Sequence, residues 1–128
     1  MKNGVNLLID SNILIYWLGG NLNAAEILSE NIIHYSIITE IEVKGHTSLI
    51  TQEEKIKLEK VLNRFEKISL TEEIKELAIE YKIQYNLKTP DAIIAATARF
   101  LKLPLVTGDK KVSQVENIII VLFTPENN

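Results

Sequence analysis

Short apolar runs alternate with helical segments along almost the whole chain, and this alternation limits the fold more than any other feature of the sequence. The runs are rich in β-branched residues and flanked by polar ones, which is typical of buried strands. Such an alternation predicts an α/β domain, with a mostly parallel sheet of about five strands and helices on both faces. We expect the strands at Val5–Ile9, Ile32–Ile37, Lys67–Leu70, Leu103–Thr107 and Ile118–Leu122.

Most of the helical segments have recognisable start signals. The Thr51 segment has the form of a capping box, with Glu three residues later. Another start signal has Pro90 at the first helical position, and the helix after it, Ala92–Leu101, is apolar on most sides and should be the most buried. Asp10 or Ser11 can cap a helix through Ile13–Leu18, and further N-caps are expected at Thr39, Thr51, Thr71 and Thr89.

The composition suits a single globular domain. A chain of 128 residues with 46% hydrophobic residues can bury one core. The absence of cysteine excludes a disulfide scaffold and a thiolate zinc site. The longest apolar runs, such as Ile13–Leu18, are far below the ~20 residues of a membrane span. We therefore expect a cytoplasmic protein without membrane association, with one domain over residues 1–123 and a C-terminal tail at residues 124–128.

The distribution of acids is informative about function. The chain has 17 acidic residues, and only Asp10, Asp91 and Asp109 are aspartates. Glu is frequent on solvated helix faces, whereas Asp prefers caps, turns and sites. Asp10 follows the first expected strand, Asp109 follows the fourth, and Glu42 lies on the helix after the second. Ligand sites of open α/β sheets form at the carboxyl ends of the strands. These acids should therefore converge there, joined by Asp91 if its helix begins at that edge.

Taken alone, each acid has an ordinary structural explanation. Asp10 can serve as a helix cap, Asp91 can complement a helix dipole, Asp109 can occupy a turn, and Glu42 can be a solvated helix residue. Together, however, four carboxylates at one edge would repel each other unless a cation lay among them. Carboxylates are the ligands that Mg²⁺ and Mn²⁺ prefer, and such ions activate water for attack on phosphodiesters. The acids therefore predict metal-dependent phosphodiester hydrolysis.

Four segments resemble, in order and approximate spacing, the successive motifs of PIN-domain proteins of the VapC toxin type. They are LLIDSN at 7–12, SIITEIE at 36–42, PDAIIAATA at 90–98 and LVTGD at 105–109. The resemblance implies a PIN-like three-layer α/β/α fold. It places the family's catalytic and metal-binding acids on Asp10, Glu42, Asp91 and Asp109, with Glu42 preferred to Glu40. Asn12 and Thr107 match auxiliary polar positions near the metal.

The same resemblance implies a function. It predicts a Mg²⁺ (or Mn²⁺)-dependent endoribonuclease, the toxin of a type II toxin–antitoxin system, that leaves a 5′-phosphate on its RNA substrate. A small cognate antitoxin and a homodimer are the implied partners. The sequence departs from the pattern at Gly108, where many relatives carry Arg, and at Lys110-Lys111, where some carry a further Asp. These departures leave the four acids intact and bear on whether a second metal binds tightly.

Other functions remain open at this point. A non-toxin RNA-processing nuclease would have the same motifs. A receiver-like or phosphohydrolase-like domain phosphorylated on Asp10 is disfavoured, because Asn12 stands where a second Asp is usual. A silent binding module has no reason to hold like charges together. Tyr16 and Trp17 are expected in the core, or alternatively in an exposed partner contact. His34 and His46 are expected to have ordinary roles, and phosphate contacts are open to Lys44, Arg99, Lys110 and Lys111.

Overall fold

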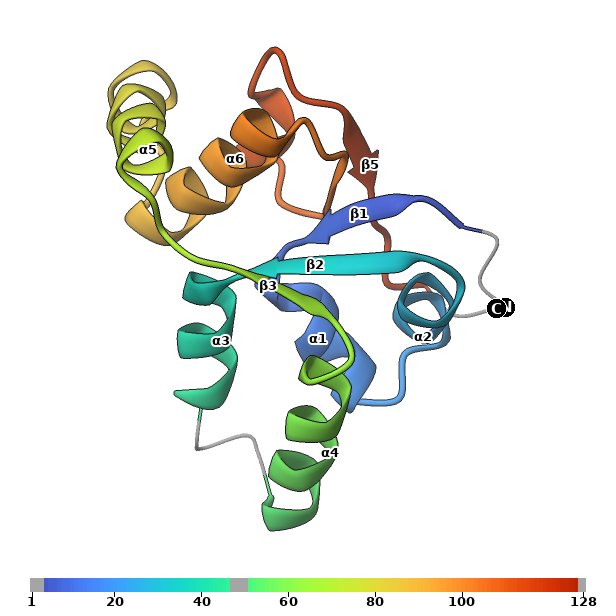
Figure 1. The fold of residues 1–128 in the computed structure, drawn as a ribbon. Coiled ribbons are helices and arrows are strands. Elements are labelled where there is room, and N and C mark those ends of the chain that lie inside the picture. The colour runs from blue at the N-terminus through green and yellow to red at the C-terminus, as the bar shows by residue number, and fades with distance from the viewer. Residues whose placement is uncertain (1–3, 47–50, 127–128) are drawn as a thin grey trace.

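The strands of the computed structural model, which describes residues 4–46 and 51–126, form one parallel sheet in the order β3-β2-β1-β4-β5 (Figure 1). The chain moves outward from the central β1 to β2 and β3, then returns to β4 beside β1 and ends in β5. The strand order thus reverses between β1 and β4. Their bounds are β1 (Asn6–Ile9), β2 (Ile32–Ser36), β3 (Glu66–Ile68), β4 (Leu105–Thr107) and β5 (Ile120–Leu122).

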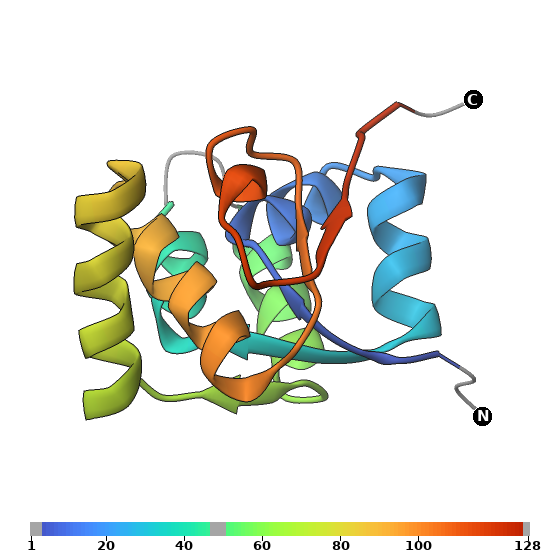
Figure 2. The same cartoon turned by 90° about the horizontal axis from the view of Figure 1, so that it is seen from above.

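Helices cover both faces of the sheet, which confirms the predicted three-layer α/β/α fold. Viewed from above, α5 and α6 run side by side (Figure 2). At the carboxyl edge of the sheet, α3 contacts both α1 and α6. The helices are α1 (Ser11–Leu18), α2 (Leu22–Glu30), α3 (Ile37–Lys44), α4 (Gln52–Leu62), α5 (Glu72–Tyr85) and α6 (Thr89–Leu101), with a 3₁₀ turn η2 (Val112–Gln114) after β4.

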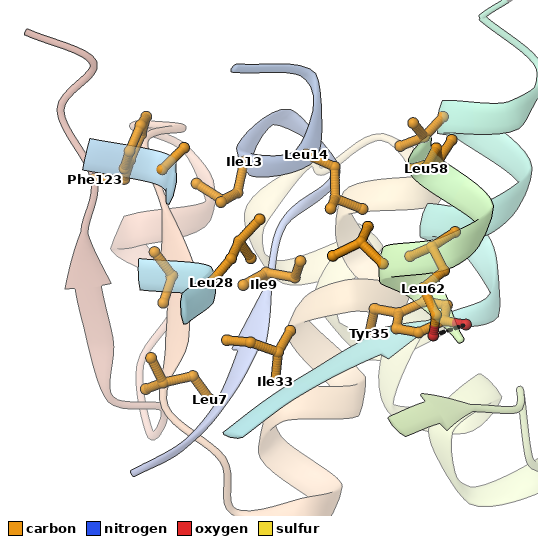
Figure 3. Close-up of a cluster of buried hydrophobic side chains, with 14 residues drawn as sticks. Leu7, Ile9, Ile13, Leu14, Leu28, Ile33, Tyr35, Leu58, Leu62 and Phe123 are labelled. Carbon is orange, nitrogen blue, oxygen red and sulfur yellow. Dashed lines mark hydrogen bonds between the residues drawn. The ribbon is translucent and has the colours of Figure 1, made fainter. Parts of the chain in front are cut away.

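Two apolar clusters form the core, one on each face of the sheet, because successive strand side chains point to opposite faces. On β1, Leu7 and Ile9 join the cluster beneath α1, α2 and α4, whereas Leu8 joins the cluster beneath α5 and α6. Figure 3 shows the first cluster, in which residues of β1 and β2 pack against Ile13, Leu14, Leu28, Leu58 and Leu62.

The predicted N-caps are confirmed for α4 and α5. The Thr51 side chain accepts the backbone N–H of Glu54, and the Glu54 carboxylate accepts the N–H of Thr51 at 2.8 Å, so the capping box is complete. The Thr71 hydroxyl accepts the N–H of Ile74 at 3.2 Å. Short-range sequence signals suffice here because both partners lie within one turn of helix.

The predicted caps at Thr39 and Thr89 are wrong. Ser36 caps α3 through the N–H of Ile38, so the helix begins at Ile37, a residue expected at the end of a strand. Thr39 is consequently buried inside the helix. Thr89 is the first residue of α6, and its hydroxyl accepts a hydrogen bond from Lys82 Nζ at 2.9 Å. Both hydroxyls accept hydrogen bonds from side chains of other helices, Thr39 from Ser11 and Thr89 from Lys82.

Within the described residues, no helix combines the length and the apolar character needed to cross a lipid bilayer.

The chain after β5 turns back onto the start of α2. Asn21 Nδ2 donates to the carbonyl of Pro125 at 2.6 Å, and Asn23 Nδ2 donates to the carbonyl of Thr124 at 3.0 Å.

Replacing Leu8 by Ala should lower the free energy of unfolding by about 2–5 kcal/mol, because this fully buried side chain lies at the centre of the sheet. Ile83→Ala is the matched control: Ile83 is 80% exposed on α5, so its truncation should change stability by no more than about 0.5 kcal/mol. Chemical denaturation measures both. Similar losses in the two variants would contradict the assignment of Leu8 to the core.

Candidate active site

Asp10 lies at the point where the strand order reverses. It follows β1 directly and caps α1, with its Oδ1 accepting the backbone N–H of Ser11 at 2.7 Å. Its Oδ2 accepts the hydroxyl of Thr107, the last residue of β4, at 2.7 Å. The Asp10 residue is only 5% exposed. Side-chain bonding therefore joins the carboxyl ends of the two central strands at Asp10.

Glu42 reaches the same edge from α3. Its Oε1 accepts a hydrogen bond from Ser11 Oγ at 2.6 Å, and Ser11 Oγ also lies 3.0 Å from Thr39 Oγ1. Ser11 thus links the helix after β2 to the helix after β1, directly beside Asp10. Sequence reasoning assigned Ser11 only a capping role. Its position between Asp10 and Asn12 in the first motif is the one signal that could have singled it out.

Glu40 has a different role from Glu42. Its carboxylate forms ion pairs with Lys44 at 2.7 Å and Lys67 at 3.0 Å, and these hydrogen bonds hold the pKa of Glu40 below its usual value. Lys44 also pairs with Glu59 of α4. Glu40 and Lys44 therefore belong to a network that joins α3, α4 and β3, so the structure does not support a phosphate contact for Lys44.

Asp109 is held by backbone groups in the loop after β4. Its Oδ1 accepts the N–H groups of Lys111 and Val112 at 2.8 and 3.0 Å, which starts η2. Its own N–H donates to Thr107 Oγ1 at 3.1 Å. The residue is therefore a local turn former, as the simpler explanation supposed. Its anchor Thr107 is also the partner of Asp10.

Asp91 enters from α6, one residue after Pro90 in the first turn of the helix. Burial, followed by the charges of Asp10, Asp109 and Glu42, raises its pKa to about 6. Burial also raises the pKa of Asp10, with smaller contributions from the charges of Asp109 and Glu42 and opposing hydrogen bonds from Thr107 and Ser11. The structure therefore brings all four predicted acids within electrostatic range of one another.

The side chains of the four acids do not converge on a single point. Within residues 4–46 and 51–126, no three His, Cys, Asp or Glu side chains are arranged so that they could hold a metal ion as they stand. Glu42 and Asp109 are instead turned toward Ser11 and toward backbone N–H groups. The arrangement is one of concentrated negative charge without a formed coordination cage.

The two auxiliary residues differ in their positions. Thr107 is fully buried and contacts both Asp10 and Asp109 through its hydroxyl. Asn12 is exposed and lines a hollow together with Asp109. The histidines lie outside the acidic site: His34 Nε2 is bonded to Asn6 Oδ1 at 2.9 Å, and His46 follows the end of α3.

Of the other basic residues considered for phosphate contacts, Lys111 and Arg99 donate hydrogen bonds to backbone carbonyls. Lys111 Nζ donates to the carbonyl of Asn86 at 3.0 Å, which ties the loop of Asp109 to the segment between α5 and α6. Arg99 donates to the carbonyl of Asn117 at 3.1 Å. Lys110 is exposed beside Asp109. The contact between Lys111 and Asn86 helps to hold the start of α6, and with it Asp91, near the other acids.

The fold and the acids define an α/β domain with an acidic site at its strand switch point. The family model of the PIN domain matches residues 7–118, and the chain belongs to the PIN-domain family. A comparison with curated protein sequences gives no match. Membership in this family indicates a nuclease.

Solved structures with the same fold support this assignment. A chain of a toxin–antitoxin complex from Klebsiella pneumoniae is 30% identical, with a TM-score of 0.78 over 95% of this chain and 99% of that one. A chain of VapBC2 from Rickettsia felis, bound to a promoter DNA fragment, is 20% identical with a TM-score of 0.78, over 94% and 99% of the two chains. A chain of DNA-bound VapBC from Salmonella typhimurium is 18% identical, with a TM-score of 0.78 over 91% and 97%.

Asp91→Asn should stabilise the metal-free protein at about pH 7.5 and leave its stability almost unchanged at about pH 3. The pKa of Asp91 rises from 3.8 to about 6 on folding, so ionised Asp91 opposes folding above that range and not below it. We expect a gain of about 1 kcal/mol near pH 7.5, less than the full shift implies because the side chain is partly exposed.

Thermal or urea unfolding of both proteins in EDTA at the two pH values measures this difference. Only the difference between wild type and variant is interpreted, because other carboxyl groups titrate over the same range. Equal stabilities of the two proteins at pH 7.5 would show that burial and the neighbouring acids do not raise the pKa of Asp91 in the folded protein.

Proposed function

We propose that the chain is a Mg²⁺- or Mn²⁺-dependent endoribonuclease that acts in the cytoplasm as the toxin of a type II toxin–antitoxin system. The observation that carries the proposal is the gathering of Asp10, Glu42, Asp91 and Asp109 at the strand switch point of a PIN domain, where burial and the neighbouring acids raise the pKa values of Asp10 and Asp91. The family assignment favours this nuclease over a receiver-like domain phosphorylated on Asp10.

The four acids fit a divalent metal in their chemistry. Burial and the neighbouring carboxylates make the ionised forms of Asp10 and Asp91 unfavourable, and a hard cation removes that cost while accepting oxygen ligands. Asp10, Glu42, Asp91 and Asp109 would hold the ion. When bound, the ion supplies a Lewis acid and an activated water for attack on an RNA phosphodiester. Hydrolysis of this kind would leave a 5′-phosphate on the downstream fragment.

The remaining polar residues of the site position the acids. The Thr107 hydroxyl directs Asp10 Oδ2, and the backbone N–H of Ser11 directs Asp10 Oδ1. Ser11 Oγ holds Glu42, while the start of η2 holds Asp109. Such supporting hydrogen bonds fix the orientation of metal ligands and typically matter about 10- to 100-fold in affinity or activity.

The toxin assignment draws on the likeness to the Klebsiella pneumoniae toxin–antitoxin complex, at 30% identity over almost the whole of both chains. A small antitoxin protein is accordingly the proposed partner, and a homodimer the proposed assembly. Growth arrest on induction of the wild-type chain, relieved by co-expression of a small protein encoded beside it, supports the toxin assignment. RNA cleavage in vitro without growth arrest would favour a non-toxin RNA-processing nuclease.

Asp10→Asn should lower the rate of RNA cleavage about 100-fold or more, because it removes the most buried carboxylate of the site. Glu40→Gln is the matched control, since Glu40 lies on the same helix as Glu42 but pairs with Lys44 and Lys67. Cleavage of a labelled RNA with Mg²⁺, with Mn²⁺ and with EDTA compares the variants. Equal rates for wild type and Asp10→Asn would contradict the assignment.

Ser11→Ala should raise the Mn²⁺ concentration needed for half-maximal cleavage about 10- to 100-fold, without abolishing cleavage at saturating metal. The substitution removes the hydroxyl that holds Glu42 but keeps the backbone N–H that Asp10 accepts. A titration of cleavage rate against Mn²⁺ concentration measures the shift. An unchanged metal curve would show that the Ser11–Glu42 contact does not organise the site.

A further inference from the structure

A hollow of about 280 Å³ opens beside the acidic site on the side of β5. It is lined by Asn12, Tyr16, Gly108, Asp109, Phe123 and Pro125. Asp109 is one of the four acids, and Asn12 follows Asp10 by two residues, so the hollow is continuous with the acidic site. The proposed metal site does not explain why aromatic residues line this hollow.

Tyr16 presents an aromatic ring in this hollow. The residue is 42% exposed, and its ring centroid lies 5.4 Å from that of Phe123 with the two planes tilted by 46°. Phe123 is itself buried in the core cluster that Figure 3 shows. One side of Tyr16 is therefore supported by the protein interior, while the rest of the side chain remains accessible. This result agrees with neither a fully buried Tyr16 nor a freely projecting one.

Another part of the wall depends on the absence of a side chain at position 108. A Cβ atom on Gly108 would lie 2.9 Å from the backbone oxygen of Phe123, closer than real Cβ contacts allow. Glycine therefore lets Phe123 lie against the loop of Asp109, where its N–H donates to Thr107 O at 2.9 Å. The bond from Asn21 Nδ2 to the carbonyl of Pro125 then holds the following residues along the hollow.

We propose that this hollow is a nucleobase subsite, in which the base of a nucleotide next to the cleaved phosphate stacks on Tyr16. This inference rests on the proposed ribonuclease function. Single-stranded nucleic acids are commonly bound by stacking of bases on aromatic side chains, which tolerates different base sequences because every base has a π-face. The exposed Asn12 amide offers both a donor and an acceptor for the edge of the base.

The chemistry of the lining favours a nucleotide over a protein side chain. An apolar side chain of a partner would bury the Asn12 amide without a hydrogen-bond partner, which is costly. A nucleotide places a flat apolar base beside Tyr16 while its phosphate remains near the acids, where the proposed metal would neutralise both charges. Tyr16 is thus a substrate-binding residue in this proposal, and Gly108 is a residue that shapes the subsite.

The test compares Tyr16→Ala and wild type on two RNA oligonucleotides cleaved at one site, one intact and one with an abasic residue beside the cleaved bond. Loss of stacking should lower kcat/KM for the intact RNA about 5- to 150-fold. The loss should be much smaller for the abasic RNA. Tyr16→Phe keeps the ring and should recover most of the activity on intact RNA. Ile83→Ala, on the far surface of α5, serves as the unaffected control.

Two results would overturn the proposal. An equal loss on intact and abasic RNA would mean that Tyr16 supports the fold or serves a protein partner. No loss on either RNA would mean that the hollow is not used by the substrate. Melting temperatures of each variant, together with Tyr16→Leu, separate the loss of the Phe123 contact from the loss of stacking.

Binding gives a readout that does not depend on cleavage. Fluorescence anisotropy of the same two labelled RNAs with the full chain should show weaker binding of the abasic RNA by wild type but not by Tyr16→Ala. If wild type binds and discriminates without cleaving, the proposed nuclease function fails while the subsite stands. If wild type cleaves but Tyr16→Ala discriminates equally well, the subsite fails while the nuclease stands.

Discussion

The hydrogen bond between Thr107 Oγ1 and Asp10 Oδ2, 2.7 Å long, is the interaction on which the organisation of the site depends. It joins the carboxyl ends of β1 and β4, the two neighbouring strands between which the order of the sheet reverses. The same Thr107 hydroxyl accepts the N–H of Asp109, so one buried side chain sets the positions of two acids. Sites that are anchored on strands in this way are held more precisely than sites on loops.

The acids are a cost to the fold that a bound cation would relieve. Burial and the neighbouring carboxylates raise the pKa of Asp91 to about 6, so the metal-free site is under electrostatic strain at neutral pH. Asp10 experiences the same effects, but the hydrogen bonds from Thr107 and Ser11 oppose them. Electrostatic destabilisation of this kind is expected at functional sites, where the residues that activity requires lower the stability of the fold. A binding module without a metal would have no reason to keep this arrangement.

The sequence predicted the sheet and the general position of the acids because both follow from local patterns. Alternating apolar runs and capping signals are short-range, so the five strands, the capping box at Thr51 and the edge occupied by Asp10 and Asp109 could be inferred. The role of Ser11 and the burial of Thr39 could not, because both depend on the approach of α1 to α3. The choice of Glu42 over Glu40 came from the resemblance and stays a prediction; in the structure, two lysines form ion pairs with Glu40.

The departure at Gly108 links the site to its surroundings. At this position, where the resemblance led us to expect Arg, the chain has a glycine whose Cβ position lies against the backbone of Phe123. An arginine there would force β5 away from the loop of Asp109 and bring a positive charge beside the acids. Glycine instead lets the aromatic pair of Tyr16 and Phe123 approach the site. The chain thus has an aromatic surface next to the acids, and the proposed subsite uses this surface to bind a base.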